Sequence, residues 1–251
     1  MRDAVKTDYR VYRFKLKELL LYCALYAAAS CAVGWLFFGR PAAGAVFGAG
    51  MPLYIREVRK SLAARRRKKL TAEFRDALNL FAVSLKAGYS VERALPLTAA
   101  ELTSIYGKEA MIVREFRYMA GQLSFQVPAE QLLQNLALRS GAEEIRNFAA
   151  VFATAKRSGG NLPKIVSHAA ETISGRIEVE KEIEATLSAK KMEHRIMSVM
   201  PCGIILYMRA GSPGFLEVMY TTGLGVVIMA AALVLYALAV YWGMQIVKIE
   251  V

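Results

Sequence analysis

Two long apolar blocks, one toward each end of the chain, constrain the fold more than any other feature of the sequence. Residues 19–55 and 196–247 hold most of the apolar runs, whereas residues 56–195 hold most of the acidic and basic side chains. The 251 residues are 55% hydrophobic and carry a formal charge of +12, a combination that is unusual for one soluble domain. We therefore expect membrane segments at both ends and a water-exposed domain between them.

The first block is expected to form a transmembrane helical hairpin over residues 19–55. Leu19–Phe38 has no charge and is about 20 residues long, which is enough for a helix to cross a bilayer. A Gly-Arg-Pro sequence then interrupts it, and residues 41–55, although short for a full span, are uncharged and must return the chain. Gly44 and Gly48 are four residues apart, the spacing that lets two membrane helices pack closely.

The second block is expected to form a transmembrane pair over residues 196–247. Gly223–Val247 is apolar throughout and has no ionisable side chain. The preceding run, Ile196–Met208, is short and contains Pro201. Because proline removes a backbone hydrogen bond within a helix, we expect this helix to begin in the preceding domain and to kink inside the membrane.

Basic residues flank both blocks and predict the topology. They are abundant in the N-terminal segment 1–18 and in the linker 56–70, and Lys248 begins the short tail 248–251. Cytoplasmic flanks of membrane helices are enriched in lysine and arginine. The sequence therefore predicts a multi-pass protein of the inner membrane, with both termini and the domain 71–195 in the cytoplasm.

The central domain, residues 71–195, is expected to be a bundle of six helices, so the predicted fold class is all-α. Apolar residues recur there at three- and four-residue spacing, and no stretch alternates convincingly between apolar and polar residues. Gly88 and the pair Gly159 and Gly160 are the expected structural turns, and Ser90 and Asn161 are expected helix caps. The first apolar stripe comprises Phe74, Ala77, Leu78, Phe81, Ala82 and Leu85.

The sequence contains few residues that could act in catalysis, and we expect neither an enzyme nor a cofactor or metal site. His168 and His194 are the only histidines, and neither has a partner at a recognised ligand spacing. Glu178 and Glu182 share one helix face, but the acidic residues between and after them point elsewhere, so the string cannot converge on one ion. We expect Glu178 and Glu182 to face solvent or a partner.

The basic run that begins with Arg65, Arg66 and Arg67 is a second candidate surface for partners. Its position directly after a membrane segment favours a role in topology and contact with anionic lipids. Binding of nucleic acid by a membrane-tethered regulator is the less favoured alternative. We expect anionic lipids and no nucleic acid among the partners.

Two stretches of the domain resemble a known family. The stretch from Phe74 to Ser90 with the following Ala94 and Leu95 resembles the opening helix pair of the type II secretion F domain. The segment from Phe152 through Gly159, Gly160 and Leu162, with the long helix to Pro201, resembles the close of that domain. One domain copy, an N-terminal membrane pair and the C-terminal ending Gly243–Val251 are most similar to the TadB-type platform proteins of tight-adherence (Flp) pili.

The resemblance implies an inner-membrane platform that couples a hexameric secretion ATPase in the cytoplasm to the extraction and assembly of pilin subunits. Members of the classical systems carry two domain copies, so it also implies pairing with a second copy or with a TadC-like platform protein. A transporter or channel subunit, in which the helical domain gates the membrane helices, is the alternative. The absence of ionisable side chains from Gly223–Val247 weakens this alternative, because ion pathways normally need buried charge.

Overall fold

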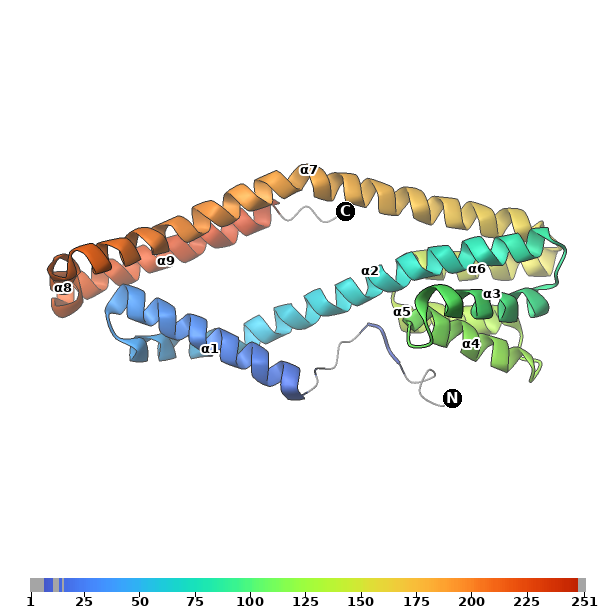
Figure 1. Cartoon of the computed structure of the whole chain (residues 1–251), viewed down its shortest axis with the longest axis horizontal. Coiled ribbons are helices and arrows are strands. Elements are labelled where there is room, and N and C mark those ends of the chain that lie inside the picture. Colours follow the sequence, from blue (N-terminus) through green and yellow to red (C-terminus); the bar gives the residue numbers. More distant parts are fainter. Residues whose placement is uncertain (1–6, 11–13, 15, 248–251) are drawn as a thin grey trace. The chain divides into compact units, whose positions relative to one another are not determined.

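The computed structural model describes residues 7–10, 14 and 16–247. These residues form α-helices and one 3₁₀ helix, with no strand in the described part of the chain (Figure 1). The predicted all-α fold class is therefore confirmed. The predicted tail 248–251 and most of the predicted basic segment 1–18 lie outside the described residues.

The chain divides into two compact units. The helical unit comprises the described part of Met1–Arg13 together with Val58–Val179. The membrane unit comprises Phe14–Glu57 and Glu180–Val251, as far as these are described. Two long helices contribute residues to both units: α2 (Met51–Lys86) and α7 (Leu162–Gly211).

Six helices make up the described part of the helical unit, as predicted. Between α2 and α7 come four shorter ones: α3 (Val91–Tyr106), α4 (Met111–Leu123), α5 (Ala129–Ser140) and α6 (Glu143–Ser158). The predicted turns lie where these helices end: Gly88 and Gly159 have positive φ angles of 87° and 70°, a backbone conformation that favours glycine. Asn161 caps α7, because its Oδ1 accepts a hydrogen bond from the backbone N–H of Lys164 at 3.1 Å.

The core of the helical unit is formed by buried residues of the six helices from α2 to α7, together with Tyr9 (Figure 1). Every residue of the predicted first stripe, from Phe74 to Leu85, is buried. Phe74 meets Phe148 of α6 edge to face, with 5.5 Å between ring centroids, and Phe81 lies 6.3 Å from Phe152. Apolar spacing in the sequence therefore identified the core face of α2 correctly.

Residues 56–70, which the sequence suggested as a linker, are helical and lie within α2. The α2 helix runs for 36 residues without interruption. Leucine, alanine, lysine, arginine and glutamate, all strong helix formers, dominate this stretch and explain why it continues as a helix.

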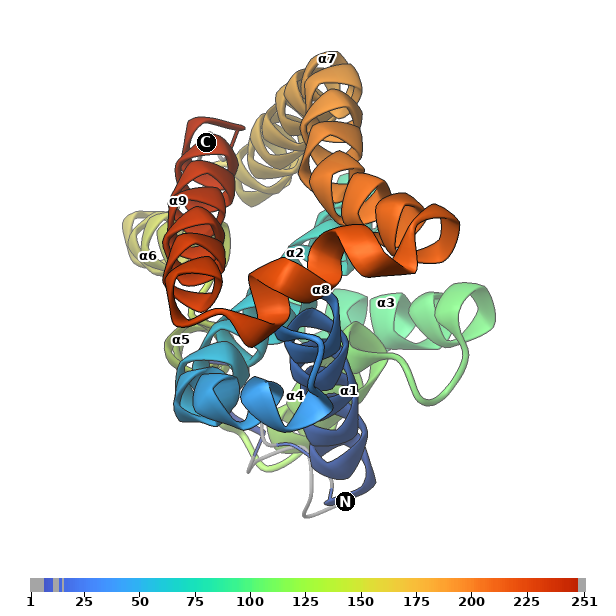
Figure 2. The ribbon, with the colours of Figure 1, turned by 90° about the vertical axis from the view of Figure 1, so that its left-hand side faces the viewer.

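The membrane unit contains α1 (Leu16–Phe38), the 3₁₀ helix η2 (Pro41–Gly50), α8 (Pro213–Thr221) and α9 (Gly223–Val247). Figure 2 shows α8 bridging the end of α7 and the start of α9. By length and composition, α1 and α9 can each cross a membrane. Full spans by residues 41–55 and by Ile196–Met208 stay predictions.

Gly44 makes the close approach that the sequence predicted, but Gly48 does not. A Cβ atom added to Gly44 would overlap the carbonyl of Ser30 and lie 2.9 Å from the Cα of Cys31, both on α1. A Cβ added to Gly48 would have no neighbour within 4 Å. The prediction assumed an α-helix, in which residues four apart share a face, whereas a 3₁₀ helix rotates them by about 120°.

A second close approach joins α7 to α9. A Cβ added to Gly243 would overlap the imidazole ring of His194, whose Nε2 has no hydrogen-bond partner among the described residues. The hydroxyl of Tyr236 donates a hydrogen bond to the carbonyl of Ser198, one turn before Pro201. Pro201 lies inside α7, as predicted.

The contrast between Gly44 and Gly48 gives a paired test. We expect Gly44→Ala to lower the free energy of unfolding by about 1–3 kcal/mol, because the added methyl group forces α1 and η2 apart. Gly48→Ala, which adds the same methyl group into open space, is expected to be neutral within about 0.5 kcal/mol. Thermal unfolding of the full chain in neutral detergent measures both, and equal losses would contradict the assigned contact.

Candidate functional site

A buried polar network joins the N-terminal segment to the helical unit. The Tyr9 side chain is only 1% exposed, and its hydroxyl donates a hydrogen bond of 2.8 Å to Oε1 of Glu115 on α4. Arg139 of α5 donates two further bonds to the same carboxylate, at 2.8 Å from Nη1 and 2.5 Å from Nη2. The backbone N–H of Tyr9 also donates to the carbonyl of Arg139 at 2.9 Å. Residue 9 therefore belongs to the domain although 48 residues separate it from Val58.

Two arginines of the predicted basic surface take part in this arrangement. The guanidinium carbon of Arg66 lies 4.9 Å from the centroid of the Tyr9 ring, within cation–π range. Arg67 and Arg10 lie beside Gly141, whose positive φ of 63° ends α5. Arg65, in contrast, is exposed. Of the three arginines, Arg65 is therefore the most accessible to a partner.

Two tyrosines of the helical unit hold their protons more tightly than usual. Burial, followed by the negative charge of Glu115, raises the pKa of Tyr9 above its ordinary value. A hydrogen bond to Asp76, followed by burial, raises the pKa of Tyr106 to about 12. Both groups are neutral near pH 7 and act there as hydrogen-bond donors rather than as bases.

A second buried carboxylate lies at the N-terminus of α4. Glu73 of α2 is 4% exposed, and its Oε2 accepts a hydrogen bond of 3.2 Å from the backbone N–H of Ile112. The first N–H groups of a helix lack partners within the helix, and its dipole favours a negative charge there. Glu73 therefore fixes α4 to α2 and has a structural role.

A groove of about 370 Å³ runs between α6 and α7 within the helical unit. Phe148, Val151 and Ile165 are among its apolar lining residues, and Lys164 and His168 are among the polar ones. An ion pair of 3.1 Å between Arg176 and Glu144 joins the same two helices. The groove can take an apolar side chain with a flanking carboxylate.

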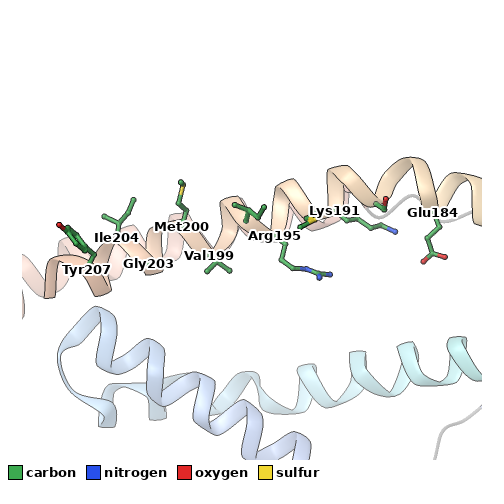
Figure 3. Close-up of a pocket in the computed structure, with 11 residues that line it drawn as sticks. Glu184, Lys191, Arg195, Val199, Met200, Gly203, Ile204 and Tyr207 are labelled. Carbon is green, nitrogen blue, oxygen red and sulfur yellow. The ribbon is translucent and has the colours of Figure 1, made fainter. Parts of the chain in front are cut away.

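A larger hollow, of about 940 Å³, follows one helix of the membrane unit. All its lining residues belong to α7, and we call this surface the α7 face. Figure 3 shows Glu184, Lys191 and Arg195 toward one end and Met200, Ile204 and Tyr207 toward the other. The full set is Glu184, Ser188, Lys191, Met192, Arg195, Ile196, Val199, Met200, Gly203, Ile204 and Tyr207.

The two acidic residues predicted to bind a partner are accessible. Glu178 and Glu182 are both exposed on α7, and none of the ion pairs in the described part of the chain involves either carboxylate. No group of three or more His, Cys, Asp or Glu side chains in that part could hold a metal ion.

An aromatic and basic cluster lies at the expected outer end of the membrane unit. The guanidinium carbon of Arg209 is 4.0 Å from the centroid of the Trp35 ring and 5.6 Å from that of Tyr220. The hydroxyl of Tyr220 donates a hydrogen bond of 2.7 Å to the carbonyl of Leu36. Tryptophan, tyrosine and arginine are the residues that commonly lie at the level of lipid headgroups.

The family model for "Type II secretion system (T2SS), protein F" matches residues 77–209, which is more than half of the chain. The chain belongs to this family. The match begins on the core face of α2 and ends near the end of α7, so it includes the end of α2, the whole of α3 to α6 and all but the last residues of α7. Searches of curated proteins and of solved structures found no significant match. Family membership, together with two helices that are long and apolar enough to cross a membrane, indicates that the chain is a membrane protein.

The buried network predicts a graded loss of stability in this F-family protein. Glu115→Ala removes the carboxylate that balances the charge of the partly buried Arg139 guanidinium and is expected to cost about 3–5 kcal/mol of the free energy of unfolding. Tyr9→Phe removes one hydrogen bond and is expected to cost about 1–2 kcal/mol. Glu115→Ala also removes the hydrogen bond from the Tyr9 hydroxyl, since Oε1 of Glu115 is its acceptor. The loss of stability in the double variant should therefore be smaller than the sum of the two single losses.

Chemical unfolding of the full chain in detergent tests these values. Glu144→Ala is the control, since it breaks the more exposed ion pair with Arg176 and should cost about 1 kcal/mol or less. Losses for Tyr9→Phe and Glu115→Ala no larger than that of the control would contradict the assigned role of the network.

Alkaline pH provides an independent test of Tyr9. A group whose pKa is raised on folding stabilises the fold below its unfolded pKa, which is about 10 for tyrosine, and this stabilisation is lost as the pH rises further. The melting temperature should therefore fall less steeply above about pH 10 in Tyr9→Phe than in the wild type. Tyr106→Phe should also reduce the slope, and identical slopes for all three proteins would count against burial of the Tyr9 hydroxyl.

Proposed function

We propose that the chain is a TadB-type inner-membrane platform protein of a tight-adherence pilus or a related type II secretion-like machine, and that it is not an enzyme. In this proposal it couples a hexameric cytoplasmic ATPase to the extraction and assembly of pilin subunits. The observation that carries the proposal is the family match over residues 77–209, which joins a helical domain to an apolar helix segment.

The continuity of α7 supports a mechanical role. This helix has 50 residues, which corresponds to about 75 Å at the usual rise. Its first part, including Val166, Ala170 and Ile173, is buried in the core of the helical unit. Its last part carries the apolar residues of the α7 face. A displacement of the helical unit by the ATPase would therefore be passed along one continuous element toward the membrane unit, whose other helices we propose to handle pilin.

Charge suggests where the ATPase binds. Glu178 and Glu182 form an exposed acidic pair one helical turn apart, and we propose that it binds a basic patch of the ATPase. We propose that Arg65 and the neighbouring basic residues contact anionic lipids. A TadC-like protein or a second copy of the chain would complete the platform. Both termini and the helical unit would then lie in the cytoplasm.

Reversing the acidic pair tests the ATPase contact. We expect Glu178→Lys combined with Glu182→Lys to reduce capture of the cognate ATPase from detergent extracts at least tenfold, because like charges then face one another. The matched control is Glu101→Lys combined with Glu109→Lys, which changes the same charge at two exposed positions of the helical unit.

The control variant is expected to capture the ATPase as the wild type does. If the Glu178 and Glu182 variant binds equally well, the ATPase contacts another surface. Hydrolysis of nucleotide by the purified chain alone would contradict the proposed role of a platform without activity of its own.

A further inference from the structure

The α7 face has its positive charge at one end. Lys191 and Arg195 are four residues apart and therefore lie on the same side of the helix. Neither takes part in the ion pairs of the described residues, whereas the adjacent Lys190 binds Glu193 at 3.0 Å. The only acidic group on this face is Glu184, about two turns before Lys191. The two cations therefore offer a site for an anion immediately before the apolar part of α7.

The rest of the α7 face is apolar and uncovered. Ile196, Val199, Met200 and Ile204 are exposed by 56%, 62%, 62% and 55%. Gly203 lies among them, and a Cβ added there would meet nothing within 4 Å. Side chains of this kind are stable where hydrocarbon replaces water around them. The face therefore combines an anion site at one end with a hydrocarbon-binding surface along the other.

We propose that the α7 face binds an anionic phospholipid, with its phosphate on Lys191 and Arg195 and its acyl chains along Ile196–Tyr207. Basic residues at the cytoplasmic boundary of membrane helices bind such headgroups. This inference rests on the proposed membrane placement of Ile196–Met208 and goes beyond the platform role. It assigns a lipid site to α7, separate from the basic run that begins at Arg65.

Charge favours a lipid over a second copy of the chain as the occupant. Two copies inserted with the same topology would align α7 in parallel. Parallel pairing through this face would place Arg195 near Arg195 and Lys191 near Lys191, with Glu184 two turns away from either pair. Like charges at the edge of a low-dielectric region repel strongly. An anionic headgroup removes this repulsion, and its acyl chains match the apolar surface that follows.

Lipid titration of the purified full chain tests the site. Native mass spectrometry in neutral detergent would follow binding of phosphatidylglycerol, phosphatidylcholine and inorganic phosphate. We expect phosphatidylglycerol to bind more tightly than either of the others, since only it combines a net negative charge with acyl chains. Lys191→Gln combined with Arg195→Gln should weaken its binding about thirtyfold, because each basic residue near an anionic lipid contributes about a fivefold factor.

The matched control is Lys181→Gln combined with Lys190→Gln, which removes two charges from α7 outside the α7 face. This control is expected to bind phosphatidylglycerol as the wild type does. Equal weakening in both variants, or equal binding of phosphatidylcholine and phosphatidylglycerol by the wild type, would overturn the proposal. Binding of inorganic phosphate as tight as that of phosphatidylglycerol would also overturn it, because the acyl chains would then contribute nothing.

A photo-crosslinking residue in place of Met200 identifies the occupant in native membranes. The expected product is a phospholipid adduct on the chain, reduced in the Lys191 and Arg195 variant. A crosslink to a second copy or to another protein as the main product would assign the face to that partner and overturn the lipid site. Neither experiment needs the ATPase or pilin, so its failure is distinguishable from failure of the platform role.

Discussion

In the proposed platform, one helix, α7, lies partly in water and partly in the membrane, and the rest of the structure depends on how it does so. Its first third packs into the helical unit through Val166, Ala170 and Ile173. After Arg195 the same helix becomes apolar on its exposed surface. A helix satisfies its backbone hydrogen bonds internally in either solvent, so it can pass from water to hydrocarbon without a break. The change of side chains, rather than a change of backbone, therefore sets the boundary.

The stability of the helical unit depends on how the buried carboxylate of Glu115 is satisfied. A buried carboxylate is tolerated only when its lone pairs and its charge are satisfied, and here Arg139 and Tyr9 do both. Tyr9 also brings its own backbone N–H to α5. These directional hydrogen bonds fix the position of Tyr9 on the helical unit more specifically than an apolar contact would. Deletion of the segment that contains Tyr9 would expose the buried ion pair between Arg139 and Glu115.

Most helices of the helical unit and their ends were predictable from local signals, although the start of α2 was not. The spacing of Phe74, Leu78 and Phe81 gave the core face of α2, and Gly159 with Asn161 gave the boundary between α6 and α7. Glu115 gave a signal that the sequence interpretation missed: it lies on the helix face of the buried residues Ile112, Phe116 and Met119, where a charge requires a partner. The identity of that partner was not predictable.

Tyr9 lies 106 positions from Glu115, and no periodicity or spacing connects residues that meet only through the tertiary fold. Gly48 shows a second reason why a prediction from sequence can fail. Its expected packing role assumed an α-helix, whereas the chain forms a 3₁₀ helix there. Proline at the start and three glycines among ten residues allow either form, and Gly44 packs closely against α1 in the form that the chain adopts. The contact between Tyr9 and Glu115 was missed because it joins residues far apart in the sequence. The role of Gly48 was wrong because its segment has only a weak local preference between the α-helix and the 3₁₀ helix.

In the proposed membrane placement, the length of the apolar part of α7 adds a constraint on the bilayer around it. Only 13 residues, Ile196–Met208, separate Arg195 from Arg209, which corresponds to about 20 Å of helix against a hydrocarbon core of about 30 Å. Arg209 is held by Trp35 and Tyr220, so it cannot move freely toward the headgroups. The mismatch must then be relieved by extension of the Arg195 side chain or by local thinning of the bilayer. In the proposed placement, either adjustment brings lipid phosphates and the two cations Lys191 and Arg195 together, and neither cation forms an ion pair within the described residues.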